Sequence, residues 1–318
     1  MKWLTAVLIS AIILFAFMPS AMSQPAAQGP QKKGPVLPKP DHQDVKYGPY
    51  ERNVLDLWKA KSEKPTPLLV NIHGGGFRAG DKSSLGPGLL RLCLDSGISV
   101  ASINYRYSQQ AVFPAPMLDG ARAVQFLRCH AEEYHLDPNR IACTGGSAGA
   151  GISLWIGFHP DLADPKSDDP VARQSTRLTC MAVFGAQCSY DPHFIKELIG
   201  GRAWEHSALL QLYGLKPEEA DTPRARKLFE EAAPITYVSK DSPPVWMFYT
   251  EAKGPLPPDA RPGQGIHHIK FGEALKAKLD PLGVECIVLH SDDYKGKPPG
   301  QNMRDMLEFL QRHFGAEK

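Results

Sequence analysis

A single serine lies at the centre of the stretch IACTGGSAGAG, between an apolar run typical of a buried strand and the start of a helix. Gly145 to Gly149 satisfy the pattern G-x-S-x-G with Ser147 in the middle. A serine of this kind acts as a nucleophile when the chain turns sharply from strand to helix, and its neighbours must then lack bulk. Every neighbour here is glycine or alanine. We predict a positive or otherwise rare φ at Ser147; the alternative is an ordinary glycine-rich turn.

A second glycine-rich stretch, NIHGGGFRAGDK, follows an earlier apolar run. The three glycines after His73 allow backbone N–H groups to face a tetrahedral intermediate with no side chain in the way. The amides of Gly75, Gly76 and Ala148 are the candidate donors of an oxyanion hole. We interpret His73 as a residue that orients this loop through hydrogen bonds, with a direct catalytic role as the alternative.

These motifs need a scaffold that brings several strand ends together. Short apolar runs alternate with stretches of helical periodicity, which predicts the α/β class, with a mainly parallel sheet covered by helices on both faces. Asp119, at the start of one predicted helix, is expected to form a cap or a structural salt bridge. The strands are expected within residues 67–76, 97–108, 140–146, 178–186, 244–250 and 284–290, and the helices within 117–134, from 148, up to about 231, 271–279 and near the C-terminus.

The chain resembles an α/β-hydrolase of the carboxylesterase and lipase type, in the group of hormone-sensitive-lipase-like and acetyl-xylan or feruloyl esterase-like enzymes. The resemblance is carried by NIHGGGFRAGDK, VASINYRYS, FPAPMLDGARAVQFLRCHAEEYHLDPNRIACTGGSAGAG and AAPITYVSKDSPPVWMFY, which are spread over most of residues 65–250. It implies the α/β-hydrolase fold, a nucleophile at Ser147 and an oxyanion hole at Gly75, Gly76 and Ala148. It also implies an acid and a histidine in the loops after the last two strands.

The C-terminal third departs from that family pattern. Lys253 stands where the family places its acid, Glu251 lies two residues earlier, and Asp259 lies beyond a proline-rich insertion. The family's histidine would follow the last strand, but SDDYKGKPPGQ contains none. A serine hydroxyl is a poor nucleophile without a base that accepts its proton. The position of the base is therefore the open question.

A relocated base must come from a segment that borders the carboxyl ends of the last strands. His268 and His290 are the first candidates, and His267 is ranked behind them. Asp259 or Glu251 would orient the imidazole by accepting its second ring proton. The alternatives are a structural strand-end residue at position 290 and rim or capping residues at positions 267 and 268.

The N-terminus has the pattern of a signal peptide. Residues 1–23 contain Lys2, an apolar run, Pro19, and the small residues Ala21 and Ser23 at the spacing that a signal peptidase recognises. We expect export to the periplasm or the medium, with no stable membrane span after cleavage; the alternative is an uncleaved anchor helix. Residues 24–44, rich in Pro, Gly, Gln and Lys, are predicted to be a linker, and 45–318 the hydrolase domain.

Composition narrows the range of partners. The 318 residues carry a formal net charge of only +2 with no long run of one sign, so nucleic acid is not an expected partner. The six cysteines are irregularly spaced and favour buried core positions, with a Cys180–Cys188 disulfide as the weaker alternative. No metal-ligand spacing occurs, so neither a metal nor another cofactor is expected.

Two functions from different classes fit these observations. The first is an exported serine hydrolase that cleaves a short acyl ester, with a carbohydrate as one candidate for the alcohol. The second is a catalytically impaired relative that binds a small ligand or carbohydrate without turnover. The retained Ser147 and glycine loop favour the first function, because a binding module does not need a strained turn. The missing histidine favours the second.

Overall fold

The computed structural model describes residues 37–315, which contain an eight-stranded sheet in the order β1-β2-β4-β3-β5-β6-β7-β8. The pairs β1–β2 and β2–β4 are antiparallel, and every other neighbouring pair is parallel. The predicted α/β class with a mainly parallel sheet is confirmed. The strands are β1 (His42–Lys46), β2 (Val54–Trp58), β3 (Thr66–Ile72), β4 (Ser99–Ile103), β5 (Leu136–Gly146), β6 (Cys180–Phe184), β7 (Val245–Tyr249) and β8 (Cys286–His290).

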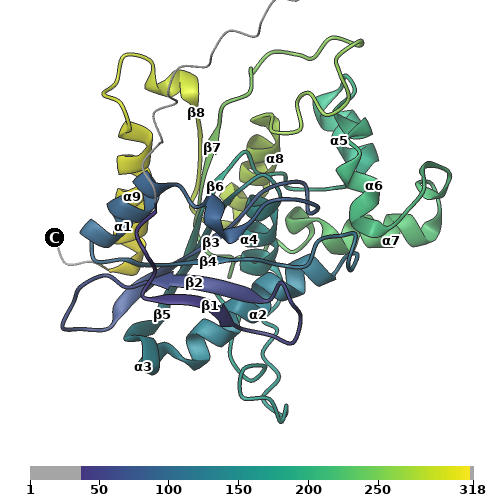
Figure 1. Cartoon of the computed structure of the whole chain (residues 1–318). Helices are drawn as coiled ribbons and strands as arrows, with labels where there is room; N and C mark the ends of the chain where they lie inside the picture. The colour runs from purple at the N-terminus through teal and green to yellow at the C-terminus, as the bar shows by residue number, and fades with distance from the viewer. Residues whose placement is uncertain (1–36, 316–318) are drawn as a thin grey trace, which may run out of the picture. The chain divides into compact units, whose positions relative to one another are not determined.

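Helices cover both faces of the sheet (Figure 1). α1 (Pro87–Asp95) and α9 (Gln301–Phe314) pack on one face, and α2 (Ala115–Cys129), α4 (Ala148–Phe158) and α8 (Lys270–Leu279) pack on the other. Each face of the sheet has its own hydrophobic core, and side chains alternate between the faces of a strand. Ala142 in β5 therefore belongs to the core under α1 and α9, and its neighbour Cys143 belongs to the core under α2, α4 and α8. The other α-helices of the described region are α3 (Ala131–Tyr134), α5 (Pro192–Ile199), α6 (Ala208–Tyr213) and α7 (Pro223–Ala232).

The β1–β2 hairpin was not among the predicted strands. β1 has the polar sequence HQDVK and lies at the exposed edge of the sheet, so it lacks the apolar pattern by which a strand is recognised. The described structure includes residues of the predicted linker: β1 begins at His42, and the Trp58 indole donates a hydrogen bond to the Pro38 carbonyl at 2.8 Å. The predicted signal peptide and most of the predicted linker lie outside the described residues.

The six cysteines are free thiols, and five of them are buried. The Cys180–Cys188 disulfide does not form, because the two residues belong to the cores on opposite faces of the sheet. Asp119 in α2 forms the structural salt bridge, at 2.7 Å to the Arg106 guanidinium, and it also accepts the Arg106 backbone N–H. Between residues 37 and 315 no helix has the length and apolarity that a membrane crossing requires.

Candidate active site

Ser147 occupies the turn between β5 and α4. Its backbone has φ 52° and ψ −121°, a conformation that side-chain-bearing residues rarely adopt, so the predicted positive φ is confirmed. The turn brings the first residues of α4 against the end of β3. A Cβ atom on Gly149 would lie 2.0 Å from the carbonyl oxygen of Ile72, so only glycine permits this approach. The serine is thereby set beside the glycine loop that follows β3.

The glycine loop and the start of α4 line the same cavity as Ser147. Gly75, Gly76 and Ala148 all border it. The amides of Gly75 and Gly76 form no hydrogen bond within residues 37–315, so their N–H groups are available to a ligand. The geometry therefore brings together the three residues that the sequence nominates for an oxyanion hole.

His73 anchors this loop. Its Nδ1–H donates to the Gly74 carbonyl at 2.8 Å, and its Nε2 faces the Arg52 guanidinium at 3.3 Å. The ring stacks on Tyr105 with 4.3 Å between ring centroids. Burial lowers the pKa of His73 from 6.5 to about 4, with the nearby Arg52 charge acting in the same direction. The contacts are those of a neutral, orienting histidine.

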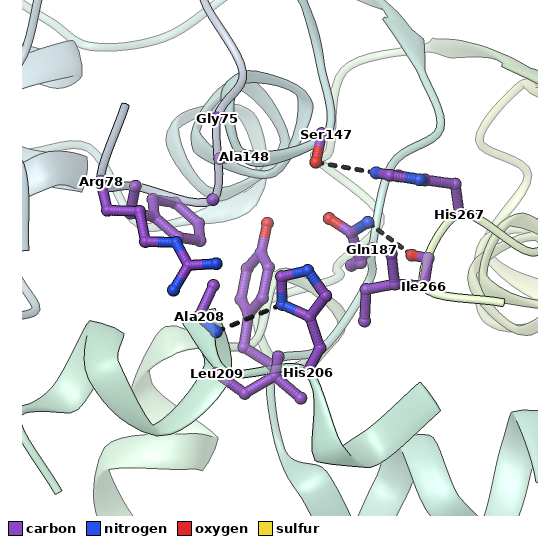
Figure 2. A pocket seen from close by; sticks show the side chains of 13 residues that line it. Gly75, Arg78, Ser147, Ala148, Gln187, His206, Ala208, Leu209, Ile266 and His267 are labelled. Atoms are coloured by element: carbon purple, nitrogen blue, oxygen red, sulfur yellow. Dashed lines mark hydrogen bonds between the residues drawn. The ribbon is translucent and has the colours of Figure 1, made fainter. Parts of the chain in front are cut away.

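His267 lies against the serine hydroxyl. Its Nε2 is 2.8 Å from Ser147 Oγ, and Figure 2 shows the ring turned toward the serine at the edge of the cavity. Because a carboxylate oxygen can only accept, the Glu251 carboxylate beside Nδ1 favours the tautomer with its proton on Nδ1, in which Nε2 accepts from the serine hydroxyl. That nitrogen faces one carboxylate oxygen of Glu251 at 3.5 Å, while the other oxygen accepts the backbone N–H of His267 at 3.2 Å. Serine, imidazole and carboxylate thus follow one another in the order of a catalytic triad.

The two histidines ranked ahead of His267 lie elsewhere. The Nε2–H of His268 donates to the Gly254 carbonyl at 3.2 Å, and its Nδ1 accepts the Lys270 N–H. The Nε2–H of His290 donates to the Glu251 carbonyl at 2.7 Å. Both rings are buried. His268 and His290 therefore tie down the loop between β7 and α8 and do not contact Ser147.

Asp259 does not orient an imidazole either. It lies exposed in the β7–α8 loop and forms no hydrogen bond or ion pair with any residue of the described chain. Glu251, the other acid that the sequence left open, is the one beside His267. Lys253, which the sequence resemblance places in the position of the acid, pairs with Asp293 at 3.3 Å. This ion pair joins the segment after β7 to the segment after β8.

Further cavity residues were missed by sequence reasoning. The cavity has a volume of about 400 Å³ and is also lined by Arg78, Gln187 and His206 (Figure 2). The Gln187 amide donates to the Ile266 carbonyl at 2.6 Å and so fixes the backbone one residue before His267. Isolated polar residues in loops carry no periodic pattern, and no spacing in the sequence could have identified them.

Comparison with known proteins places this site in a family. A model of the BD-FAE family matches residues 55–259. The chain belongs to the BD-FAE family. The matched region includes the glycine loop, Ser147 and Glu251 but ends before His267. The match therefore does not extend to the residue that faces the serine.

Curated relatives of this BD-FAE member are named as ester hydrolases. The probable carboxylic ester hydrolase LipM of Mycobacterium tuberculosis (strain ATCC 25618 / H37Rv) is 30% identical over 212 residues, 65% of this chain and 46% of that protein. The esterase LipQ of the same organism is 29% identical over 224 residues, 69% of this chain and 50% of that protein. The chain thus spans about half the length of the curated relatives it matches.

Solved structures agree on the fold. A truncated carbohydrate esterase from gut microbiota superimposes with a TM-score of 0.66 at 20% identity, over 86% of this chain and 96% of that chain. An acetyl ester-xyloside bifunctional hydrolase from Caldicellulosiruptor lactoaceticus gives 0.64 at 24% identity, over 88% and 99%. The BD-FAE member described here has the α/β-hydrolase fold of the esterase and lipase type.

Proposed function

We propose that this protein is an exported serine esterase that cleaves short acyl esters, with Ser147 as nucleophile, His267 as base and Glu251 as the orienting acid. The observation that carries the proposal is the 2.8 Å contact between His267 Nε2 and Ser147 Oγ. A base within hydrogen-bond reach of the proton that it removes is the geometric requirement of general base catalysis. The names of the curated relatives, a carboxylic ester hydrolase and an esterase, also support it.

The proposed reaction has two halves. Ser147 Oγ attacks the ester carbonyl while its proton passes to His267 Nε2, and the carbonyl oxygen takes up negative charge between the amides of Gly75, Gly76 and Ala148. The bond to the alcohol then breaks, and His267 returns the proton to the leaving oxygen. Water attacks the acyl-serine by the same route and releases the acid. The Glu251 carboxylate stabilises the imidazolium that forms in each half.

The competing function, binding without turnover, rested on the missing histidine after β8. His267 supplies an imidazole from the preceding connection, so that reason no longer favours the binding function. A protein that only binds its ligand has no use for a strained serine aligned with an imidazole and a carboxylate.

A carbohydrate is the alcohol that we propose for the substrate. A second cavity of about 760 Å³ shares His206 with the first and is lined by Trp204, Lys196 and Gln211 among others. An aromatic ring beside hydrogen-bonding side chains suits a sugar, which has both apolar and polar surfaces. The names of the two solved neighbours, a carbohydrate esterase and an acetyl ester-xyloside hydrolase, point the same way.

The catalytic assignment is tested by hydrolysis of aryl acetates and by fluorophosphonate labelling in parallel. Ser147→Ala and His267→Ala should each lose at least about a thousandfold in rate, and both should lose labelling. His42→Ala, on the edge strand β1, is the control and should retain both. Folded wild-type protein that neither labels nor hydrolyses any short ester would favour the binding function. Full activity in His267→Ala would instead return His268 and His290 as candidates.

Export is tested separately. The full-length chain is expressed with its own N-terminus in a bacterial host, and the cell fractions are analysed by mass spectrometry. The expected product begins at Gln24 and is found outside the cytoplasm. An intact N-terminus in the membrane fraction would instead support the anchor helix.

A further inference from the structure

The cavity beside Ser147 has an unbalanced set of charges. Thirteen residues line it, and they include Arg78 and two histidines but neither aspartate nor glutamate. Glu251, the acid of the proposed triad, does not line the cavity; it faces Nδ1 of His267 and accepts the His267 backbone N–H. Glu205, next in sequence to His206, is paired with Arg202 at 2.5 Å. A ligand in the cavity therefore meets positive charge that no lining carboxylate offsets.

Arg78 is held in place without being neutralised. Its Nη1 donates to the side-chain oxygen of Gln211 at 2.9 Å, and Gln211 is uncharged. Within residues 37–315 no carboxylate lies within salt-bridge distance of its guanidinium. Figure 2 shows Arg78 extending into the space between the glycine loop and His206. An arginine that keeps unused N–H groups in a fixed fork is suited to a carboxylate.

His206 supplies a second donor in the same space. Its Nδ1 accepts the backbone N–H of Ala208 at 3.2 Å, so the proton of the neutral ring is on Nε2. Burial lowers the pKa of His206, and the positive charge of Arg78 lowers it further. The ring is therefore a neutral donor near neutral pH.

We infer that the enzyme prefers esters that carry a carboxylate close to the scissile bond, and that Arg78 binds this carboxylate with His206 as a further donor. This inference rests on the proposed esterase function and specifies its substrate class. The carboxylate can belong to the acyl group or to the alcohol. In both cases it sits where the cavity offers a cation and N–H donors and no competing acid.

Two matched pairs of esters test the preference and distinguish the two sources of the carboxylate. Methyl hemisuccinate against methyl levulinate compares an acyl carboxylate with a neutral ketone of the same shape. O-acetylglycolate against acetoxyacetone makes the same comparison on the alcohol side. Hydrolysis is followed at pH 7.5 by titrating the released acid. The expected kcat/KM ratio, anionic over neutral, is at least about tenfold in one pair, as a charge-assisted hydrogen bond would give.

Variants assign the preference to Arg78. Arg78→Gln should reduce the ratio to about one, and Arg78→Lys should retain part of it because the charge remains. The control is Arg91→Gln, which removes the same charge from an exposed side chain in α1 and should leave the ratio unchanged. A wild-type ratio near one in both pairs, or an equal fall in Arg91→Gln, overturns the inference and leaves the esterase proposal intact.

A binding measurement decides the case in which none of the four esters is hydrolysed. Calorimetric titration of Ser147→Ala with methyl hemisuccinate and with methyl levulinate measures affinity without turnover. If the hemisuccinate binds more tightly and this preference is lost when Arg78→Gln is added, the anion site is supported even though the esterase proposal has then failed. Equal affinity for the two esters overturns the inference of an anion site.

Discussion

Lowering the pH from 7.5 to 4.5 should destabilise the wild-type protein more than a His73→Asn variant. In the folded protein the pKa of His73 is lowered to about 4, against 6.5 for an unperturbed imidazole. Between these two values the unfolded chain binds a proton that the folded chain does not. Stability is therefore lost as the pH falls through 6.5 toward 4. The main structural cause is burial of the ring, which disfavours the charged imidazolium, and the Arg52 guanidinium, which faces Nε2 where the proton would add, acts in the same direction.

The size of the effect follows from the two pKa values. The full difference corresponds to about 3 kcal/mol, of which about 2.5 kcal/mol is lost by pH 4.5. The side-chain amide of the variant would keep a donor for the Gly74 carbonyl but would not titrate. The variant would also lose the stacking on Tyr105, so it should be about 1 kcal/mol less stable at pH 7.5.

Urea unfolding of both proteins at the two pH values measures the difference. Carboxylates that titrate in both proteins cancel in the comparison. The wild type should lose about 2.5 kcal/mol more than the variant between pH 7.5 and 4.5. Equal losses would refute the reasoning, because they would mean that His73 takes up its proton as readily in the folded protein as in the unfolded chain.

Three further substitutions have expected outcomes. Glu251→Gln should lower kcat for aryl acetates at least about a hundredfold with an unchanged urea midpoint, because the amide cannot stabilise an imidazolium; a rate within twofold would remove Glu251 from the triad. Gly151→Ala should cost about 1–3 kcal/mol in thermal unfolding, because its Cβ would lie 1.4 Å from the Tyr190 hydroxyl, and adding Tyr190→Phe should recover part of the loss. Asp119→Asn should lower the free energy of unfolding by about 3 kcal/mol in urea, since it strips the Arg106 guanidinium of its buried partner, and a change under about 0.5 kcal/mol would contradict that role.

The parts of the site that sequence reasoning located are those that constrain the backbone locally. The turn at Ser147 and the glycine loop after His73 each need small residues at fixed spacing. These residues are neighbours in the sequence, so the pattern can be recognised without the structure. The parallel strands were found for a similar reason, because runs buried on both faces are apolar throughout. The polar edge strand β1 has no such signature and was missed.

The histidine that faces Ser147 was ranked behind two others because its position depends on a long irregular connection. His267 and His268 are adjacent, and outside helices and strands no period tells which of two neighbours faces a given point. In the structure one ring reaches Ser147 and the other reaches the Gly254 carbonyl. The same reasoning applies to the acid. The sequence did not decide between Glu251 and Asp259, and only the fold of the loop shows that Glu251 is the one beside His267.

Both the acid and the imidazole of the proposed triad come from the connection between β7 and α8. Where two separate connections carry these groups, the spacing of the strands sets the distance between them, and a change in either connection disrupts the pair. Here two hydrogen bonds hold the loop: His268 donates to the Gly254 carbonyl within it, and His290 donates to the Glu251 carbonyl at its start. The acid and the imidazole are therefore positioned relative to each other by one connection. In the proposed triad the segment after β8 therefore takes no part in proton transfer, and two of the three catalytic groups depend on a single connection while the order of the strands stays the same.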